Sequence, residues 1–216
     1  GRYSPASRVF GRFDAWYYIS VALVVVHGRL ALARGRFGRK GWGEHAFRMM
    51  RAAEACGASF RITGFESVVN SPGPKVIAAN HMSMLETMVL PGVVLAADWP
   101  AVVVKDSLLR YPLFGPILRS LDPISVTREN PREDLKQVLR QGSEMLKGGR
   151  VVVLFPQATR SPGFDPAQFN SLAVKLAARA EVPIVPVALK TDFQGIGRRL
   201  RDVGPLDRSK PVHIAF

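Results

Sequence analysis

Short apolar runs separated by longer helical segments place the strongest limit on how this chain folds. Four of the runs are rich in Val, Ile or Ala, which is typical of strands that are buried on both faces. They occupy residues 75–78, 100–105, 150–155 and 182–189. Strands that alternate with helices predict an α/β fold with a mixed, largely parallel sheet flanked by helices.

The same patterns predict the remaining elements. One or two strands are expected at residues 59–69, with Gly64 as a bulge. Further strands are expected at residues 124–127 and 212–216. Helices are expected at residues 84–97, 108–121, 131–147 and 168–180. The second of these contains two prolines, so it is expected to be broken or short.

The positive charge of the chain is concentrated near its N-terminus. The net charge is +13 over 216 residues. Residues 1–61 hold eleven Lys and Arg against three Asp and Glu, or +8, and the remainder holds nineteen against fourteen, or +5. A basic segment of this kind predicts an anionic partner, either membrane lipid or nucleic acid.

An uncharged run of twelve residues lies inside this basic segment, at residues 15–26, with Trp16, Tyr17 and Tyr18 at one end. As a helix it covers roughly 18 Å, which is short of the ~30 Å hydrocarbon core of a bilayer. Aromatic side chains of this kind favour the boundary between membrane and water. We therefore expect a helix that dips into one leaflet.

A second helix is predicted at residues 41–57, with Phe47, Met50 and Ala53 on its apolar face. The two helices together predict an N-terminal membrane-associated helical hairpin. Residues 1–57 would then be a basic membrane-association segment, and residues 58–216 a separate α/β domain. The alternatives are a hairpin that only packs on the domain and a secretory signal peptide.

A polar cluster at residues 79–86, Ala-Asn-His-Met-Ser-Met-Leu-Glu, joins the strand at 75–78 to the following helix. Positions i and i+5 lie about 140° apart on a helix, so His81 and Glu86 meet only if His81 lies in the preceding turn. Ser83 and Glu86 fit an S-x-x-E capping box with Ser83 as N-cap. A neutral imidazole held by a carboxylate is a general base for a hydroxyl.

Each residue of this cluster also has a purely structural interpretation. His81 would then be a buried side chain bonded to a backbone carbonyl, and Glu86 would only cap the helix. Asn80 is expected to shape the turn, with donation to a tetrahedral oxyanion as the alternative.

A second polar segment follows the strand at residues 150–155. Its residues are Phe155, Pro156, Gln157, Ala158, Thr159, Arg160 and Ser161. Backbone N–H groups, two hydroxyls and a guanidinium together suit a phosphate or another oxyanion. The alternative is a polar turn with a solvated arginine.

Taken in order, these motifs resemble the PlsC-type glycerolipid acyltransferases. Asn80-His81 with Glu86 resembles the family block N-H-x-x-x-x-D, and residues 155–161 resemble F-P-E-G-T-R-S. Residues 182–187 resemble V-P-[IV]-x-P-[VI], and the segment from Lys105 to Arg128 fits the outline of the remaining block. The resemblance covers roughly residues 76–189, and four blocks in order are far more specific than one.

The resemblance implies a membrane-associated enzyme like 1-acylglycerol-3-phosphate acyltransferase, at the cytoplasmic face. It would move a fatty acyl group from acyl-CoA or acyl carrier protein to the hydroxyl of a lysophospholipid similar to lysophosphatidic acid. His81 would be the general base and Glu86 would fix its tautomer. The implied substrate-binding residues are Lys105, Arg128, Phe155, Pro156, Gln157, Thr159, Arg160 and Ser161. Arg128 and Arg160 would hold the acceptor's phosphate. No cofactor is implied, and the four scattered histidines predict no metal site.

Three positions depart from the family pattern. Glu86 stands in place of Asp, which adds one methylene to the side chain. Gln157 stands in place of Glu and removes a negative charge, and Ala158 stands in place of Gly and restricts the backbone. The last two favour an alternative acceptor, such as a lyso-aminolipid or glycerol 3-phosphate.

Two alternatives lie outside the enzyme class. A basic nucleic-acid-binding domain would explain the charge, but the chain has neither an aromatic-rich binding strand nor a basic recognition helix, so no nucleic acid partner is expected. A membrane-surface protein that keeps the fold without catalysis is the other alternative.

Overall fold

The fold is a seven-stranded sheet with helices on both faces, in a computed structural model that describes residues 12–71, 73–157 and 159–216. The strands are β1 (Phe60–Thr63), β2 (Val76–Ala79), β3 (Pro100–Lys105), β4 (Ile124–Val126), β5 (Val151–Leu154), β6 (Ile184–Lys190) and β7 (Val212–Ala215). Their order in the sheet is β1-β7-β6-β2-β5-β3-β4. Neighbouring strands are parallel except β6 and β7, which confirms the predicted mixed, largely parallel sheet.

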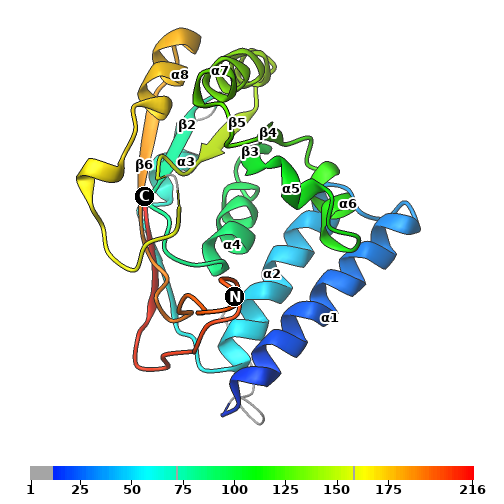
Figure 1. The fold of residues 1–216 in the computed structure, drawn as a ribbon. Helices are drawn as coiled ribbons and strands as arrows, with labels where there is room; N and C mark the ends of the chain where they lie inside the picture. The colour runs from blue at the N-terminus through cyan, green and yellow to red at the C-terminus, as the bar shows by residue number, and fades with distance from the viewer. Residues whose placement is uncertain (1–11, 72, 158) are drawn as a thin grey trace.

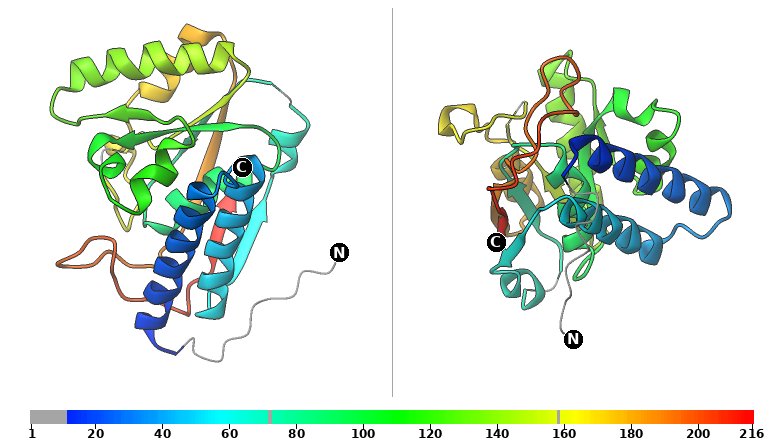
Figure 2. Two further views of the ribbon diagram at one scale, coloured as in Figure 1. Left: turned by 90° about the vertical axis from the view of Figure 1, so that its right-hand side faces the viewer. Right: turned by 90° about the horizontal axis from the view of Figure 1, so that it is seen from below.

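The helices divide between the two faces of this sheet (Figure 1). They are α1 (Asp14–Ala33), α2 (Arg39–Ala55), α3 (Glu66–Val69), α4 (Leu85–Val94), α5 (Asp106–Leu109), α6 (Phe114–Arg119), α7 (Pro131–Lys147) and α8 (Leu172–Ala180). A short 3₁₀ helix, η1, spans Pro166–Gln168. Helices α7 and α8 cover one face, and α4 with the α1–α2 hairpin covers the other (Figures 1 and 2).

Alternation along the central strands fills two cores. In β5, Val151 and Val153 contact the core shared with α2 and α4, whereas Val152 and Leu154 contact the core under α7 and α8. All four side chains are at most 1% exposed. Because successive side chains of a strand point to opposite faces, a strand covered on both faces must be apolar throughout. This is why the continuous Val-rich runs predicted the strands.

The segment at residues 59–69 is only partly a strand. It forms β1, but residues after Gly64 turn away from the sheet and form helix α3. Gly64 adopts a φ of 69°, and a Cβ there would lie 2.4 Å from the carbonyl oxygen of Phe216. The glycine therefore ends the strand rather than forming a bulge within it.

Helix α2 buries only part of the apolar face that was predicted. Phe47 is 50% exposed, whereas Trp42, Met49 and Ala53 are buried in the core with α4. The contact with α4 is close, because a Cβ at Gly92 would lie 2.0 Å from the Cβ of Ala46. The packing of α2 on α4 thus sets the buried face, and Phe47 and Met50 lie at its border.

Helix α1 is longer than the uncharged run within it. Its twenty residues extend over about 30 Å, and its length and composition are those of a helix that could cross a membrane. The helix packs on α2 and α6, and its buried residues are Tyr17, Val21 and Gly28. Large apolar side chains on the helix and at its start remain exposed at helical spacing: Phe13, Trp16, Ile19, Leu23, Val26 and Leu30. We call these six residues the α1 stripe.

Candidate active site

His81 lies in the turn between β2 and α4, and Glu86 lies in the first turn of α4. The two side chains meet as their spacing predicts, with 2.9 Å between Nδ1 of His81 and Oε1 of Glu86. Glu86 is fully buried and His81 is 9% exposed. The ring of Phe155 stacks on the imidazole, with 4.5 Å between ring centroids. The imidazole thus contacts a carboxylate through Nδ1 and an aromatic ring across one face.

Glu86 accepts hydrogen bonds from several donors besides His81. Its Oε1 accepts from the backbone N–H groups of Met82 and Ser83, at 2.6 and 2.7 Å. Its Oε2 accepts from the hydroxyls of Ser83 and Thr191, at 2.6 and 2.5 Å. Burial alone raises the pKa of the Glu86 carboxyl, but these bonds and the adjacent His81 outweigh it and lower the pKa. Glu86 is therefore an ionised acceptor.

This charge state fixes the tautomer of His81. An ionised carboxylate has no proton to donate, so in the neutral imidazole Nδ1 of His81 donates to Glu86 and Nε2 keeps its lone pair. A lone pair on Nε2 is what a general base needs.

The helix begins later than predicted. Its first residue is Leu85 and its N-cap is Met84, so Ser83 is not the N-cap. The reciprocal bonds of a capping box still form, because Ser83 Oγ accepts from the N–H of Leu85 and Glu86 accepts from the N–H of Ser83. Glu86 therefore both orders the start of the helix and contacts His81.

The backbone of His81 is held by the second polar segment. Its N–H donates to Oε1 of Gln157 at 2.5 Å, and its carbonyl accepts from the N–H of Ser161 at 2.9 Å. Gln157 is 2% exposed, and Nε2 of its amide has no hydrogen-bond partner among the described residues. Gln157 thus uses an oxygen that a glutamate would also offer, so this departure from the family pattern preserves the support of His81.

Asn80 joins β2 to the end of β6. Its Nδ2 donates to the carbonyl of Leu189 at 2.8 Å, and its Oδ1 accepts from the N–H of the same residue at 2.6 Å. The amide oxygen and one amide N–H are used within the protein. Asn80 accordingly shapes the turn, which is the interpretation that the sequence favoured.

The predicted phosphate-binding arginines are brought together from two loops. Arg128 follows β4 with a φ of 64°, held because its N–H donates to Oδ2 of Asp134 at 2.7 Å. Burial lowers the pKa of the Arg128 guanidinium, and the positive charge of Arg160 lowers it further, while Asp134 opposes both. The repulsion means that the two guanidinium groups are close enough to interact. A left-handed backbone at a non-glycine residue is costly and is typical of functional sites.

The other predicted residues lie at the same edge of the sheet. Lys105 ends β3 in register with Val126 of β4, and it is exposed. Pro156 is buried, Thr159 is exposed, and Ser161 is partly buried. Ala158 lies outside the described residues. Carboxyl ends of parallel strands commonly carry binding sites, which accounts for the convergence.

Thr191 was not predicted from the sequence. It is fully buried just after β6, and its hydroxyl contacts Glu86 from 105 residues away. It follows the predicted strand at 182–189, but nothing in its spacing or composition distinguishes it from an ordinary loop residue. Among the described residues, no cluster of three His, Cys, Asp or Glu could hold a metal ion.

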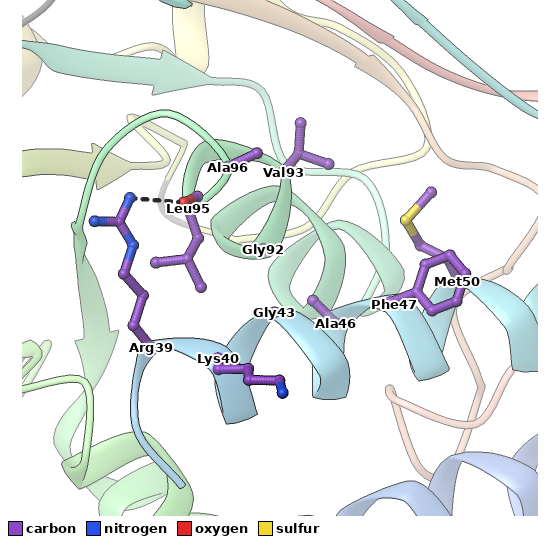
Figure 3. Close-up of a pocket in the computed structure, with 10 residues that line it drawn as sticks. All are labelled: Arg39, Lys40, Gly43, Ala46, Phe47, Met50, Gly92, Val93, Leu95 and Ala96. Atoms are coloured by element: carbon purple, nitrogen blue, oxygen red, sulfur yellow. Dashed lines mark hydrogen bonds between the residues drawn. The ribbon is translucent and has the colours of Figure 1, made fainter. Parts of the chain in front are cut away.

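An apolar groove of about 660 Å³ lies between α2 and the last turn of α4 (Figure 3). Phe47, Met50 and Val93 contribute to its apolar wall, and Arg39 and Lys40 lie at one end. Arg39 donates to the carbonyl of Leu95 at 3.1 Å. The groove includes none of the predicted site residues, so it is distinct from the His81 site.

Comparison with known proteins finds similarity to a family of acyltransferases. A family model described as Acyltransferase matches residues 59–190. Over 156 residues the chain is 35% identical to a 1-acyl-sn-glycerol-3-phosphate acyltransferase of Pseudomonas aeruginosa, covering 72% of this chain and 58% of that protein. It is 28% identical to a chloroplastic 1-acyl-sn-glycerol-3-phosphate acyltransferase of Brassica napus, covering 59% of this chain and 36% of that protein. The chain thus spans only about a third to three fifths of these relatives.

The fold is also that of a solved structure. The 1-acyl-sn-glycerophosphate acyltransferase PlsC from Thermotoga maritima superimposes with a TM-score of 0.69, over 96% of this chain and 83% of that one. The two sequences are 20% identical, so this match establishes the shared fold.

Proposed function

Because the chain belongs to the Acyltransferase family, we propose that it transfers a fatty acyl group from a thioester to the free hydroxyl of a lysophosphatidic acid-like acceptor. The donor would be acyl-CoA or acyl carrier protein. The observation that carries this proposal is the contact between Nδ1 of His81 and the ionised Glu86, which leaves Nε2 of His81 as a base.

The chemistry requires one proton to move twice. Nε2 of His81 takes the proton of the acceptor hydroxyl while the hydroxyl oxygen attacks the thioester carbonyl. The resulting tetrahedral intermediate breaks its C–S bond, and the imidazolium returns the proton to the departing thiolate. Glu86 stabilises the imidazolium between these steps, so no covalent bond to the enzyme is needed.

The acceptor's phosphate would lie against the guanidinium groups of Arg128 and Arg160. Repulsion between these two groups is relieved when an anion lies between them, which favours binding of a phosphate there. Thr159 and Ser161 would add hydroxyl donors, and Lys105 would contribute charge from the end of β3. This arrangement favours an acceptor with a phosphate over a neutral one.

Membrane association belongs to the same proposal. The α1 stripe exposes large apolar side chains along one face of the helix, and basic residues follow at 34, 36, 39 and 40. Apolar burial in the bilayer and attraction to anionic lipid would act together. The acceptor and product are lipids, so the site would be held beside the leaflet that contains them, at the cytoplasmic face.

The direct test is release of free thiol from acyl-CoA in the presence of lysophosphatidic acid. We expect His81→Ala to lower kcat by about 10²–10⁴-fold with the fold retained. Full activity in this variant would overturn the assignment of the base.

An acceptor panel addresses the alternatives, with glycerol 3-phosphate and a lyso-aminolipid in place of lysophosphatidic acid. Faster turnover of either one than of lysophosphatidic acid would identify that compound as the preferred acceptor. Vesicle binding without thiol release from any acceptor would instead indicate a non-catalytic protein.

A further inference from the structure

A hairpin loop between β6 and β7 reaches the predicted phosphate site. We call residues 194–206 the β6–β7 loop. Its two ends are joined by a bridge between Gln194 and Leu206 and by the bond from the N–H of Gly195 to the carbonyl of Pro205, at 2.9 Å. The loop is therefore an ordered hairpin whose turn carries Arg201 and Asp202.

Two adjacent residues of this loop contact the segment at 159–160. Arg201 Nη2 lies 3.2 Å from Thr159 Oγ1 and 3.3 Å from the carbonyl oxygen of Arg160. Asp202 Oδ1 lies 2.5 Å from Nη2 of Arg160. The Asp202 side chain is 51% exposed, whereas that of Arg160 is 19% exposed. The more exposed carboxylate of Asp202 thus forms an ion pair with the less exposed guanidinium of Arg160.

The loop is fixed from the opposite side by helix α1, which it meets beside the start of that helix (Figure 2). The hydroxyl of Tyr18 donates to the carbonyl of Gly204 at 2.5 Å and accepts from its N–H at 2.9 Å. The buried Gln194 accepts from Tyr17 and donates to the carbonyl of Asp202, at 3.2 and 2.9 Å. Arg201 and Asp202 are therefore held in place by contacts that do not involve Arg160.

The charges around Arg160 are mixed, because Arg128 and Arg160 repel each other while the carboxylates of Asp134 and Asp202 oppose that repulsion. Arg201 brings a third guanidinium to a segment where Arg128 and Arg160 already repel each other. Only Asp202 contributes a carboxylate from the loop, and a carboxylate on a guanidinium has the geometry of a phosphate oxygen on the same group. Among the described residues, the single ion pair of the Asp202 carboxylate, with Nη2 of Arg160, is a contact that a phosphate oxygen can also make.

We propose that the β6–β7 loop is part of the acceptor site, with Arg201 as a ligand of the acceptor's phosphate and Asp202 as the anion that the phosphate displaces from Arg160. This inference rests on the proposed function, since it concerns how that acceptor binds. It adds a residue outside the four sequence blocks, and it makes the binding of phosphate an exchange of one anion for another.

Equilibrium binding in detergent micelles tests the inference without turnover. The probes are lysophosphatidic acid and a monoacylglycerol of the same chain length, which lacks the phosphate. We expect Arg201→Ala to weaken binding of lysophosphatidic acid about tenfold and to leave monoacylglycerol binding unchanged. Arg199→Ala, at an exposed arginine two residues earlier, should change both by less than about twofold.

The role of Asp202 has its own outcome. Asp202→Asn should tighten binding of lysophosphatidic acid about threefold, and the same change should have no effect in an Arg160→Ala background. Weaker binding of lysophosphatidic acid by Asp202→Asn would mean that Asp202 holds Arg160 in place for the phosphate. That result would overturn the proposal that the phosphate displaces Asp202 from Arg160. Arg201 and Asp202 are both exposed, so the unfolding midpoint of each single variant should stay within a few degrees and serves as the folding control.

Thiol release separates this inference from the reaction itself. If the protein is active and Arg201→Ala binds lysophosphatidic acid as tightly as the parent, the inference is wrong and the reaction stands. If no acceptor is acylated but binding still depends on the phosphate and on Arg201, the proposed acyl transfer is wrong. The proposed phosphate site with Arg201 is then retained. Equal binding of both probes by the parent protein would overturn the inference.

Discussion

Glu86 is the residue on which both the start of α4 and the state of His81 depend. Its two oxygens accept from two backbone N–H groups, two hydroxyls and one imidazole. The hydroxyls of Ser83 and Thr191 can rotate and accept as well as donate, whereas the backbone groups can only donate. A glutamine can therefore keep Oε1 toward the backbone and direct Nε2 at the hydroxyls.

Glu86→Gln should separate fold from catalysis for this reason. We expect the variant to fold and to lose at least about tenfold in kcat, because the imidazolium no longer has a charged partner. Thiol release and urea unfolding are the two measurements. Normal turnover in a folded variant would assign Glu86 to structure alone.

The same substitution changes the response to acid. The pKa of Glu86 lies below its ordinary value of 4.5, so ionised Glu86 stabilises the fold above that pH. This contribution is lost as the pH falls through the lowered pKa of the folded state. The free energy of unfolding should therefore decrease less below pH 4.5 in Glu86→Gln than in the parent.

His81 and Glu86 could be paired from the sequence because both lie in one short segment, where backbone geometry limits the options. Arg160 could be placed near them because it follows a neighbouring strand of the same sheet. Thr191 and Arg201 could not be predicted, since they approach from more than 100 and 40 residues away, respectively, through loops without a periodic pattern. Only the tertiary fold determines those contacts.

At the scale of elements, the apolar runs predicted the strands well because burial on both faces leaves little choice of residue. The helix at 131–147 was also correct, since Pro131 begins it and Gly148 follows its end. The strand predicted at residues 65–69 was wrong, because the turn at Gly64 depends on the nearby carbonyl of Phe216. The predicted apolar face of α2 was right at Ala53 and wrong at Phe47, because its partner α4 is distant in sequence.

The contact between α1 and α2 contains a buried histidine. His45 is 2% exposed, and neither ring nitrogen has a hydrogen-bond partner among the described residues. Burial lowers the pKa of His45 to about 4, and the charges of His27 and Arg48 contribute. His45 therefore stays neutral in the folded protein at pH values where an unfolded histidine is protonated.

Stability should consequently fall as the pH drops from 6.5 to 4, because only the unfolded chain takes up the proton in that range. The loss from His45 would be on the order of 3 kcal/mol over the whole window. His45→Leu should remove this dependence and raise stability near neutral pH by about 1–3 kcal/mol, since two unpaired nitrogens are removed. Urea unfolding of both proteins across the window measures it. Parallel pH profiles would contradict the prediction.

Tyr18 connects α1 to the β6–β7 loop through two bonds to Gly204. Tyr18→Phe removes both while keeping the ring, so the loop should position Arg201 less well. We expect KM for lysophosphatidic acid to rise about threefold with kcat nearly unchanged. Tyr111→Phe, at an exposed tyrosine on another loop, is the matched control and should leave KM as it is.

At the scale of the whole molecule, one side carries apolar surface and basic charge while the other carries amphipathic helices. Helix α1, which carries the α1 stripe, lies away from α7 and α8, which cover the opposite face of the sheet (Figure 1). The distribution of charge was visible in the sequence, but the stripe was not. Its residues are the ones that α2 and α6 leave uncovered, and this follows from packing.

The double change Ile19→Asp and Leu23→Asp should weaken binding to anionic vesicles more than about tenfold, because two side chains of the α1 stripe lose apolar burial. Val174→Asp on α8, where the side chain is 59% exposed, is the control for an added charge. Vesicle flotation measures both. Equal flotation of the double variant and the control would place the membrane contact elsewhere.

Ala46 of α2 packs closely against Gly92 of α4. This contact joins α2 directly to the helix that carries Glu86, so the hairpin packs closely against the element that orders the proposed base. In the proposed membrane-bound state, the depth of α1 in the bilayer would therefore also fix how far the acceptor's hydroxyl must rise above the lipid surface to reach His81.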